Sequence, residues 1–261
     1  MCGRVVQKTP LGEIRVLFET VDPAPNAAPT YNGAPTDTLP IVRLDRDGRR
    51  SLDLLRWGLI PYWATDIKIG ARCINAMAET VAIKPAFRDA FARGQRCIVP
   101  VDAFYEWKKI GASKQPYAIV AADGLPLAMA GLWEHWKDRA TGDTVQTFTI
   151  ITTVPADLCA TIHDRMPVIL PREKWASWLG EREAHTDELR WMILRPYPAE
   201  LMQSYAVDVR VGNVPEQRSQ PARSRWHSGL TADVACARMG GPIFRPRFNN
   251  ARPHPTDLFE F

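Results

Sequence analysis

Six short apolar segments, each bounded by turn-forming or charged residues, constrain the fold of this chain more than any other feature. They run over residues 39–44, 52–57, 97–101, 117–122, 127–132 and 147–153. Each has a length typical of β-strands and is rich in Val, Ile, Leu or aromatic residues. The first two flank Asp47-Gly48, a dipeptide that favours a hairpin turn. We therefore expect these six segments, and a last one at 205–209, to form strands.

Helical patterns are fewer. Thr9-Pro10 has the residue types of an N-cap and a first helical position, and an apolar face follows between Leu11 and Val21. Other helices are expected at 85–93, 171–179 and 186–194, and a loop rich in Pro, Ala and Asn at 22–40. No internal repeat or interior linker interrupts these elements. One mixed α+β domain over residues 2–215 is therefore the simplest account.

The regular pattern ends near residue 215. Beyond it, arginines stand among Pro, Gly, Ser and Asn residues without an apolar period. Such a composition cannot bury enough apolar surface to offset the entropy lost on folding. We expect residues 216–261 to form a poorly ordered, Arg- and Pro-rich tail.

Composition limits the classes of function. No run of 18 apolar residues exists, so no membrane span is expected, and the start of the chain lacks the apolar stretch of a signal peptide. The five cysteines stand singly, which argues against a disulfide framework and for a reducing compartment. No paired Cys or His spacing suits zinc. A cytoplasmic protein without a metal or other cofactor is expected.

The net charge of +4 allows an acidic partner without demanding one. Most of the basic residues are arginines, and the guanidinium group binds phosphate through two parallel hydrogen bonds, which suits nucleic acid. A high arginine content can equally reflect the base composition of a genome. Composition alone leaves both interpretations open.

Cys2 is the sharpest chemical feature. It is followed by Gly3, and small residues at this point favour removal of Met1, which would leave an amine and a thiol on adjacent carbons. A free α-amine has a pKa of about 7.7–8.0, against about 10.4 for lysine, so a useful share is neutral at pH 7. It could form a Schiff base with an aldehyde, and the thiol could then close a thiazolidine ring. The alternative, that position 2 is incidental, stays open here.

Four other positions could contribute chemistry. Glu106 stands between aromatic residues, where desolvation would raise its pKa and suit acid–base work, although a surface strand position is the alternative. His163 could shuttle protons or be satisfied by its neighbours. Asn75 could orient a substrate or serve only as a turn residue. Trp63, in an aromatic loop bounded by proline, suits base stacking, with burial in the core as the alternative.

Eight short segments combine these positions in one order along the chain. They are Met1-Cys2-Gly3-Arg4, Tyr31-Asn32-Gly33-Ala34-Pro35, Trp57-Gly58-Leu59-Ile60-Pro61-Tyr62-Trp63, Asn75-Ala76-Met77-Ala78-Glu79-Thr80, Arg96-Cys97-Ile98-Val99-Pro100, Phe104-Tyr105-Glu106-Trp107, Ile162-His163-Asp164-Arg165-Met166-Pro167 and Val211-Gly212-Asn213-Val214. Each segment alone is a weak signal. In this order and spacing the chain resembles the SRAP family, the abasic-site-processing proteins that crosslink to DNA.

The resemblance implies a single domain with a β-rich, barrel-like core, flanking helices and a positive groove for single-stranded DNA. It implies that Cys2 captures the ring-opened aldehyde of an abasic site as a covalent thiazolidine crosslink, with Asn75, Glu106 and His163 matching the family's active-site residues. Residues expected to contact DNA are Arg4, Asn32, Trp63, Arg72, Trp107 and Thr152.

Two positions depart from the family pattern. Met77 stands where the family usually has arginine, two residues after the motif's asparagine, which puts one ionic contact with DNA in doubt. Arg72 is close in sequence and could substitute. Thr30 precedes Tyr31 where arginine is common. Neither departure touches the covalent chemistry.

The resemblance also implies enzyme chemistry in the DNA damage response, which is the SOS response in bacteria. Removal of Met1 by the protein itself would be a hydrolase or protease activity, and Schiff-base formation resembles that of an abasic-site lyase. A peptidase or amidohydrolase with Cys2 as nucleophile is the rival hypothesis. A third is a non-covalent single-strand binder whose Cys2 is idle. We expect a monomer, associated with the nucleoid if bacterial.

Overall fold

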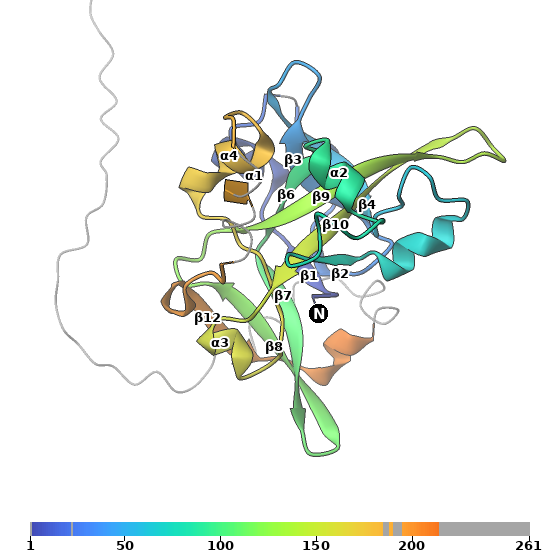
Figure 1. Ribbon diagram of the computed structural model, residues 1–261. Helices are drawn as coiled ribbons and strands as arrows, with labels where there is room; N and C mark the ends of the chain where they lie inside the picture. The colour runs from blue at the N-terminus through green and yellow to red at the C-terminus, as the bar shows by residue number, and fades with distance from the viewer. Residues whose placement is uncertain (1, 22, 185–187, 190–194, 214–261) are drawn as a thin grey trace, which may run out of the picture. The chain divides into compact units, whose positions relative to one another are not determined.

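A computed structural model of the protein describes residues 2–21, 23–184, 188–189 and 195–213 (Figure 1). Its strands are β1 (Val5–Gln7), β2 (Thr30–Gly33), β3 (Thr38–Leu44), β4 (Arg50–Trp57), β5 (Asn75–Met77), β6 (Arg96–Val101), β7 (Ala103–Ile110), β8 (Ser113–Ala121), β9 (Leu127–Lys137), β10 (Thr144–Thr153), β11 (Met166–Pro167) and β12 (Met202–Ala206). Its helices are α1 (Leu11–Phe18), α2 (Arg88–Ala92), α3 (Asp157–Ala160) and α4 (Trp175–Leu179), with short 3-10 helices η1 (Ile67–Arg72), η2 (Arg172–Lys174), η3 (Ala199–Leu201) and η4 (Val209–Gly212).

Five strands close into a barrel. Their order is β10-β4-β3-β6-β9, and β9 returns to pair with β10. Phe148 of β10 shows how the barrel closes. It lies opposite Trp57 of β4 on one edge of the strand and opposite Trp133 of β9 on the other. Short β5 and β11 extend the two edges of β10 beyond these partners. The expected α+β fold with a barrel-like core and flanking helices is confirmed.

A second sheet has the order β12-β8-β7-β1-β2, and every pairing in it is antiparallel. The start of the chain thus forms an inner strand. Val5 lies opposite Phe104, and the backbone amide of Tyr105 donates to the carbonyl of Arg4 at 3.0 Å. Because the strands are antiparallel, the residues just before Arg4 run alongside those just after Tyr105. This pairing brings the amino-terminal end of the chain to Glu106.

The barrel strands are buried on both faces. In β3, Ile41 packs into an apolar cluster with Cys2, Val5 and Phe104, while the adjacent Val42 packs into a cluster with α1, α2 and α4. A strand that is buried on both faces needs apolar residues at consecutive positions rather than at alternate ones. This explains why segments such as 39–44 and 97–101 are continuous apolar runs.

The β7–β8 hairpin continues beyond the sheet as a two-stranded projection (Figure 1). Its turn contains Gly111 at a φ of 59°, a conformation that glycine adopts without a steric penalty. Lys109 lies opposite Lys114 next to this turn, and Glu106 lies opposite Tyr117 nearer the sheet. The hairpin therefore connects the candidate acid–base residue to an exposed basic arm.

Several local predictions are confirmed, and others need correction. The hairpin over 39–57 forms, with Gly48 at a φ of 76°. Thr9 does not cap α1, because its hydroxyl bonds to the carboxylate of Asp102. The segment 22–40, expected as a loop, contains β2 and the start of β3. The last strand ends at Ala206 instead of continuing to Val209.

The expected tail over 216–261 lies outside the described residues, and so does most of the expected helix at 186–194. No helix within the described ranges is long and apolar enough to cross a bilayer. Those same ranges contain no group of three His, Cys, Asp or Glu side chains placed to hold a metal ion.

Candidate active site

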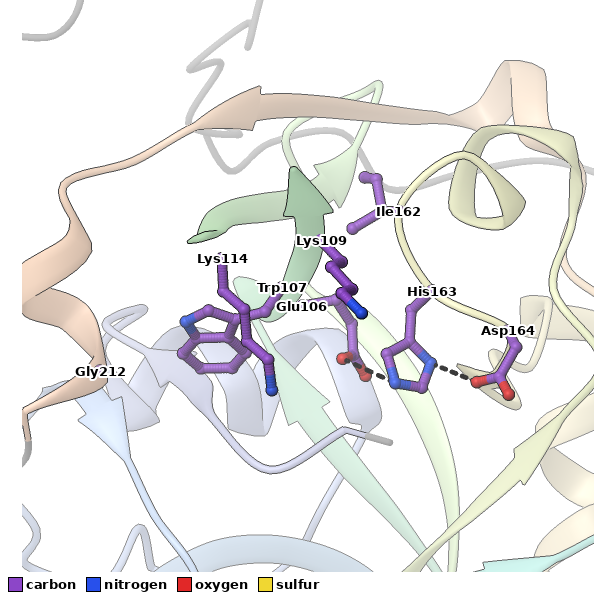
Figure 2. Close-up of a pocket in the computed structure, with 8 residues that line it drawn as sticks. All are labelled: Glu106, Trp107, Lys109, Lys114, Ile162, His163, Asp164 and Gly212. Atoms are coloured by element: carbon purple, nitrogen blue, oxygen red, sulfur yellow. Dashed lines mark ion pairs between the residues drawn. The ribbon is translucent and has the colours of Figure 1, made fainter. Parts of the chain in front are cut away.

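A cavity of about 600 Å³ opens between the β7–β8 hairpin and the segment that follows α3 (Figure 2). Its lining residues are Glu106, Trp107, Lys109, Lys114, Ile162, His163, Asp164 and Gly212. Three segments that are far apart in the sequence therefore meet here. Three of the sequence-predicted site residues, Glu106, Trp107 and His163, are among them.

Glu106 and His163 form the central polar pair. The Oε2 atom of Glu106 lies 4.0 Å from Nε2 of His163. The Glu106 side chain is 5% exposed, and this burial raises its pKa to about 7. Burial also lowers the pKa of His163, which favours a neutral imidazole. At neutral pH the site thus offers a carboxyl group that can both give and take a proton, beside an uncharged ring.

The two groups at Nδ1 of His163 have opposite requirements. The Asp164 carboxylate, at 2.8 Å, can only accept a hydrogen bond, whereas the backbone amide of Arg165, at 3.1 Å, can only donate one. The Asp164 side chain is 87% exposed, so water competes for it, while the Arg165 amide is fixed by the backbone. We assign the proton of the neutral ring to Nε2, which directs an N–H donor towards Glu106.

Cys2 lies at the buried end of this arrangement. It has no exposed surface and packs in the same apolar cluster as Phe104, Cys159 and Ile162. Burial, followed by the negative charge of Glu106, raises the pKa of the Cys2 thiol far above its usual value. The thiol is therefore protonated at neutral pH. A reaction through its sulfur needs a base close by, and Glu106 is close enough to influence it electrostatically.

Asn75 occupies β5, where it lies opposite Ile150 of β10. Both polar atoms of its side-chain amide, Nδ2 and Oδ1, are buried without a hydrogen-bond partner among the residues that the structure describes. Buried amide groups without partners are rare, because each lost hydrogen bond has a free-energy cost. The Asn75 amide therefore has hydrogen-bonding capacity that no described residue uses. It is not among the residues that line the cavity.

Thr152 and Arg165 join β10 to the His163 segment. The guanidinium of Arg165 forms two hydrogen bonds with the carboxylate of Glu79, at 2.8 and 2.9 Å. It also donates to the carbonyl of the fully buried Thr152 at 2.7 Å. Arg165 thus connects the loop that carries His163 to β10 and to the residues after β5.

The other predicted DNA-contact residues are more dispersed. The Arg4 guanidinium donates to the carbonyl of Gly3 at 3.0 Å, and burial lowers the Arg4 pKa. The Asn32 amide donates to the carbonyl of Val211 at 3.1 Å, which fastens η4 to β2. Trp63 is 41% exposed, and Arg72 is exposed at the end of η1. Neither lines the cavity, so their contact with DNA stays a prediction.

Sequence reasoning missed three features of this region. Lys109 and Lys114 line the cavity, and Glu79 holds Arg165. A signal for the lysines was present, because Gly111 lies between them and marks the turn that pairs them. Nothing in the sequence indicates the Glu79–Arg165 pair, which joins residues 86 positions apart.

Comparisons with known proteins agree with this architecture. The model of the SOS response associated peptidase family, abbreviated SRAP, matches residues 1–214. The abasic site processing protein YoqW of Bacillus subtilis is 41% identical over 84% of this chain and 97% of its own length. The abasic site processing protein YedK of Escherichia coli is 32% identical over 84% of this chain and 98% of its own length.

Solved structures give the same result for the fold. A protein from Bacteroides thetaiotaomicron superimposes with a TM-score of 0.73 at 28% identity, covering 80% of this chain and 93% of that one. A protein from Bordetella bronchiseptica gives a TM-score of 0.69 at 29% identity, covering 80% and 100%. The likeness therefore extends over most of the described residues.

Proposed function

This chain belongs to the SRAP family, and from that premise we propose that it captures abasic sites in single-stranded DNA through the amine and thiol of Cys2. The observation that carries the proposal is the position of Cys2 beside Glu106, a buried carboxyl group with a pKa of about 7. Relatives whose names describe abasic site processing support the substrate class.

The reaction begins with the free amine that removal of Met1 gives Cys2. The amine adds to the C1′ aldehyde of the ring-opened sugar, and the resulting carbinolamine loses the aldehyde oxygen as water to give an iminium ion. Glu106, in its protonated form, supplies the proton that this departing hydroxyl group needs. His163, with its proton on Nε2, donates a hydrogen bond to the sugar oxygen that ring opening releases.

Ring closure completes the crosslink. The sulfur of Cys2 attacks the iminium carbon, which forms the C–S bond, and the thiol proton passes to the Glu106 carboxylate. The net change joins one aldehyde and one aminothiol as a thiazolidine with release of one water. Because the same carboxyl group first gives and then takes a proton, a pKa near 7 suits both steps. The reverse sequence would release the DNA.

Asn75 is the residue we assign to orienting the terminal amine or its adduct. Its amide carries a donor and an acceptor that no described protein group uses. Arg4 and Trp107 are assigned to the DNA strand next to the reacting sugar, through a phosphate and a base. Trp63, Arg72, Asn32 and Thr152 remain candidates for the flanking nucleotides.

A denaturing gel tests the covalent step. The purified protein should form a heat-stable adduct with single-stranded DNA that contains an abasic site, and with no other single strand. Cys2→Ala, which keeps an amine but lacks the thiol, should form an adduct only when borohydride reduces the iminium. A heat-stable adduct of Cys2→Ala without reduction would refute ring closure by the thiol.

Removal of Met1 is a separate step that we also assign to this site. If the protein removes Met1 itself, Glu106→Gln should retain Met1 while the wild-type protein begins at Cys2. The mass of the two purified proteins distinguishes self-processing from removal by a host aminopeptidase. Absence of Met1 from both proteins would show that Glu106 is not needed for processing.

A further inference from the structure

The β7–β8 hairpin places two lysines on the wall of the cavity. Lys109 and Lys114 lie directly opposite each other in the register, and both line the space that contains Glu106 and His163. Trp107 is two residues before Lys109, so its indole ring projects from the same face of the hairpin. In Figure 2 both lysine side chains extend from the β7–β8 hairpin towards the level of the Glu106 carboxylate and the His163 ring.

This pair of charges lacks compensation within the described part of the chain. Like charges directly opposite each other on antiparallel strands repel. Neither lysine forms a salt bridge with a described residue, and the two carboxyl groups that line the cavity, Glu106 and Asp164, lie 4.0 and 2.8 Å from the ring nitrogens of His163. Burial is the main cause of the lowered pKa of His163, and the positive charge of Lys114 adds to it in the same direction. The cavity wall is therefore a site of positive charge held close to the reacting groups.

The ligand that fits two such groups is a phosphodiester. It carries one negative charge and two non-bridging oxygens, so each ammonium group can donate to one oxygen. Resting on the proposed function, we propose that Lys109 and Lys114 together bind one backbone phosphate adjacent to the abasic sugar. A phosphate held on the wall places the neighbouring sugar over Glu106, His163 and Cys2. The indole of Trp107 lines the same cavity. Its Nε1 lies about 4 Å from the position that a β-carbon on Gly212 would occupy.

Equilibrium binding tests this subsite independently of the covalent chemistry. The probe is a short single-stranded oligonucleotide with one tetrahydrofuran residue, which mimics the abasic sugar but has no aldehyde. For single strands the logarithm of the binding constant falls with the logarithm of salt concentration by about 0.7 per phosphate contact. Because both lysines bind one phosphate, the double variant should reduce this slope by about 0.7, and Lys109→Gln and Lys114→Gln should each reduce it by no more than that.

Lys108→Gln is the matched control. Lys108 is on the same strand and next to Lys109, but it does not line the cavity. Its substitution removes the same charge and should leave the slope unchanged. If Lys108→Gln reduces the slope as much as Lys109→Gln, the effect is general basicity of the hairpin and the proposal is wrong.

Neutral linkages identify the phosphate itself. A set of probes carries one methylphosphonate at each successive position around the tetrahydrofuran residue. The wild-type protein should lose about tenfold in affinity at one linkage flanking the sugar. The double variant should bind that probe and the unmodified one equally. Equal sensitivity of both proteins at every linkage would overturn the phosphate site, whereas failure of the wild-type protein to crosslink a true abasic site would overturn only the proposed function.

Discussion

At the scale of single residues, burial sets the protonation state of each group in the site. Glu106 is nearly inaccessible to water, which raises its pKa to about 7, and the same cause keeps the Cys2 thiol protonated. Neither group would have these properties on an exposed strand. The proposed reaction therefore depends on the apolar cluster around Cys2 as much as on the reacting atoms.

The pH dependence of crosslinking follows from Glu106. The protonated carboxyl group supplies the proton for water loss, and this donation leaves the carboxylate that accepts the thiol proton during ring closure. As pH rises through about 7 the starting proton is lost, so the Glu106-dependent part of the crosslinking rate should decrease with an inflection near pH 7. Glu106→Gln should slow crosslinking by about 10²-fold or more and lose this inflection. Quenched gel assays between about pH 5 and about pH 9 measure both rates. A pH profile in the variant that matches the wild type would exclude Glu106.

Stability should respond to the same titration with a definite sign. The folded-state pKa of Glu106 is raised to about 7 from an ordinary value of 4.5, so the folded protein holds this proton more tightly than the unfolded chain. Stability is therefore lost as pH rises between these values. Glu106→Gln cannot ionise, and relative to wild type it should gain on the order of 2 kcal/mol between pH 4 and pH 8. Urea unfolding at both pH values measures the difference; no gain at pH 8 would contradict the burial argument.

Glu79 should act through the position of His163. Glu79→Gln removes the negative charge and one of the two oxygens that accept from Arg165, whose side chain is 14% exposed. The crosslinking rate should fall by roughly tenfold while affinity for the tetrahydrofuran probe stays within about twofold. The control is Glu19→Gln, because Glu19 pairs with Arg172 and both side chains are at least 60% exposed. Parallel losses of affinity and rate would show that Glu79 acts on binding.

At the scale of elements, close backbone contacts fix the loops around the barrel. Gly58 has a φ of 118°, and a β-carbon there would lie 2.7 Å from the carbonyl oxygen of Gly70. This contact holds the aromatic segment 57–63 against η1. Both loops therefore depend on two glycines whose backbones touch.

Gly58→Ala should be far more destabilising than Gly48→Ala. The first adds a backbone clash to a strained φ, at a cost of about 3 kcal/mol or more. The second has a φ of 76° but no atom within 4 Å of the added carbon, so strain alone applies, about 1 kcal/mol. Thermal unfolding should show a decrease in Tm of roughly 10 °C against roughly 3 °C. Similar decreases would mean that the Gly58–Gly70 contact can relax.

Elements and their positions were predictable to different degrees. Apolar runs and Gly48 indicated the β3–β4 hairpin, because local turn geometry sets its register. The β2 strand was missed because Tyr31-Asn32-Gly33 lies in a polar, Pro-rich stretch, and its pairing with β1 is long-range. Thr9 is a residue type that often caps helices, but its hydroxyl donates a hydrogen bond to Asp102, which is 93 residues away. The order of the motifs predicted that Cys2, Glu106 and His163 belong to one site. The two lysines, Lys109 and Lys114, become apparent only from the register of β7 with β8.

At the scale of the whole molecule, both sheets contribute residues to the region around the amino-terminal strand β1. β1 enters the second sheet beside β7, while Asn75 pairs with β10 of the barrel and the buried Thr152 lies within β10. The family match ends at residue 214, close to the last described residue. We infer that residues 2–215 form the functional domain.

A chain that ends at residue 215 tests this inference. It should fold with a Tm within about 3 °C of the full chain, because the described apolar clusters lie entirely before this point. Its crosslinking rate at saturating DNA should match that of the full chain. A truncated protein that folds but does not crosslink would assign residues 216–261 to the active site.

The intact mass of the protein before and after incubation with abasic single-stranded DNA tests the central claim most directly. The mass beforehand should correspond to a chain that begins at Cys2. Afterwards it should increase by the mass of the DNA strand minus one water, and Cys2→Ala should show no such stable product. A wild-type protein whose mass stays unchanged, or whose adduct maps to a residue other than Cys2, would contradict the account.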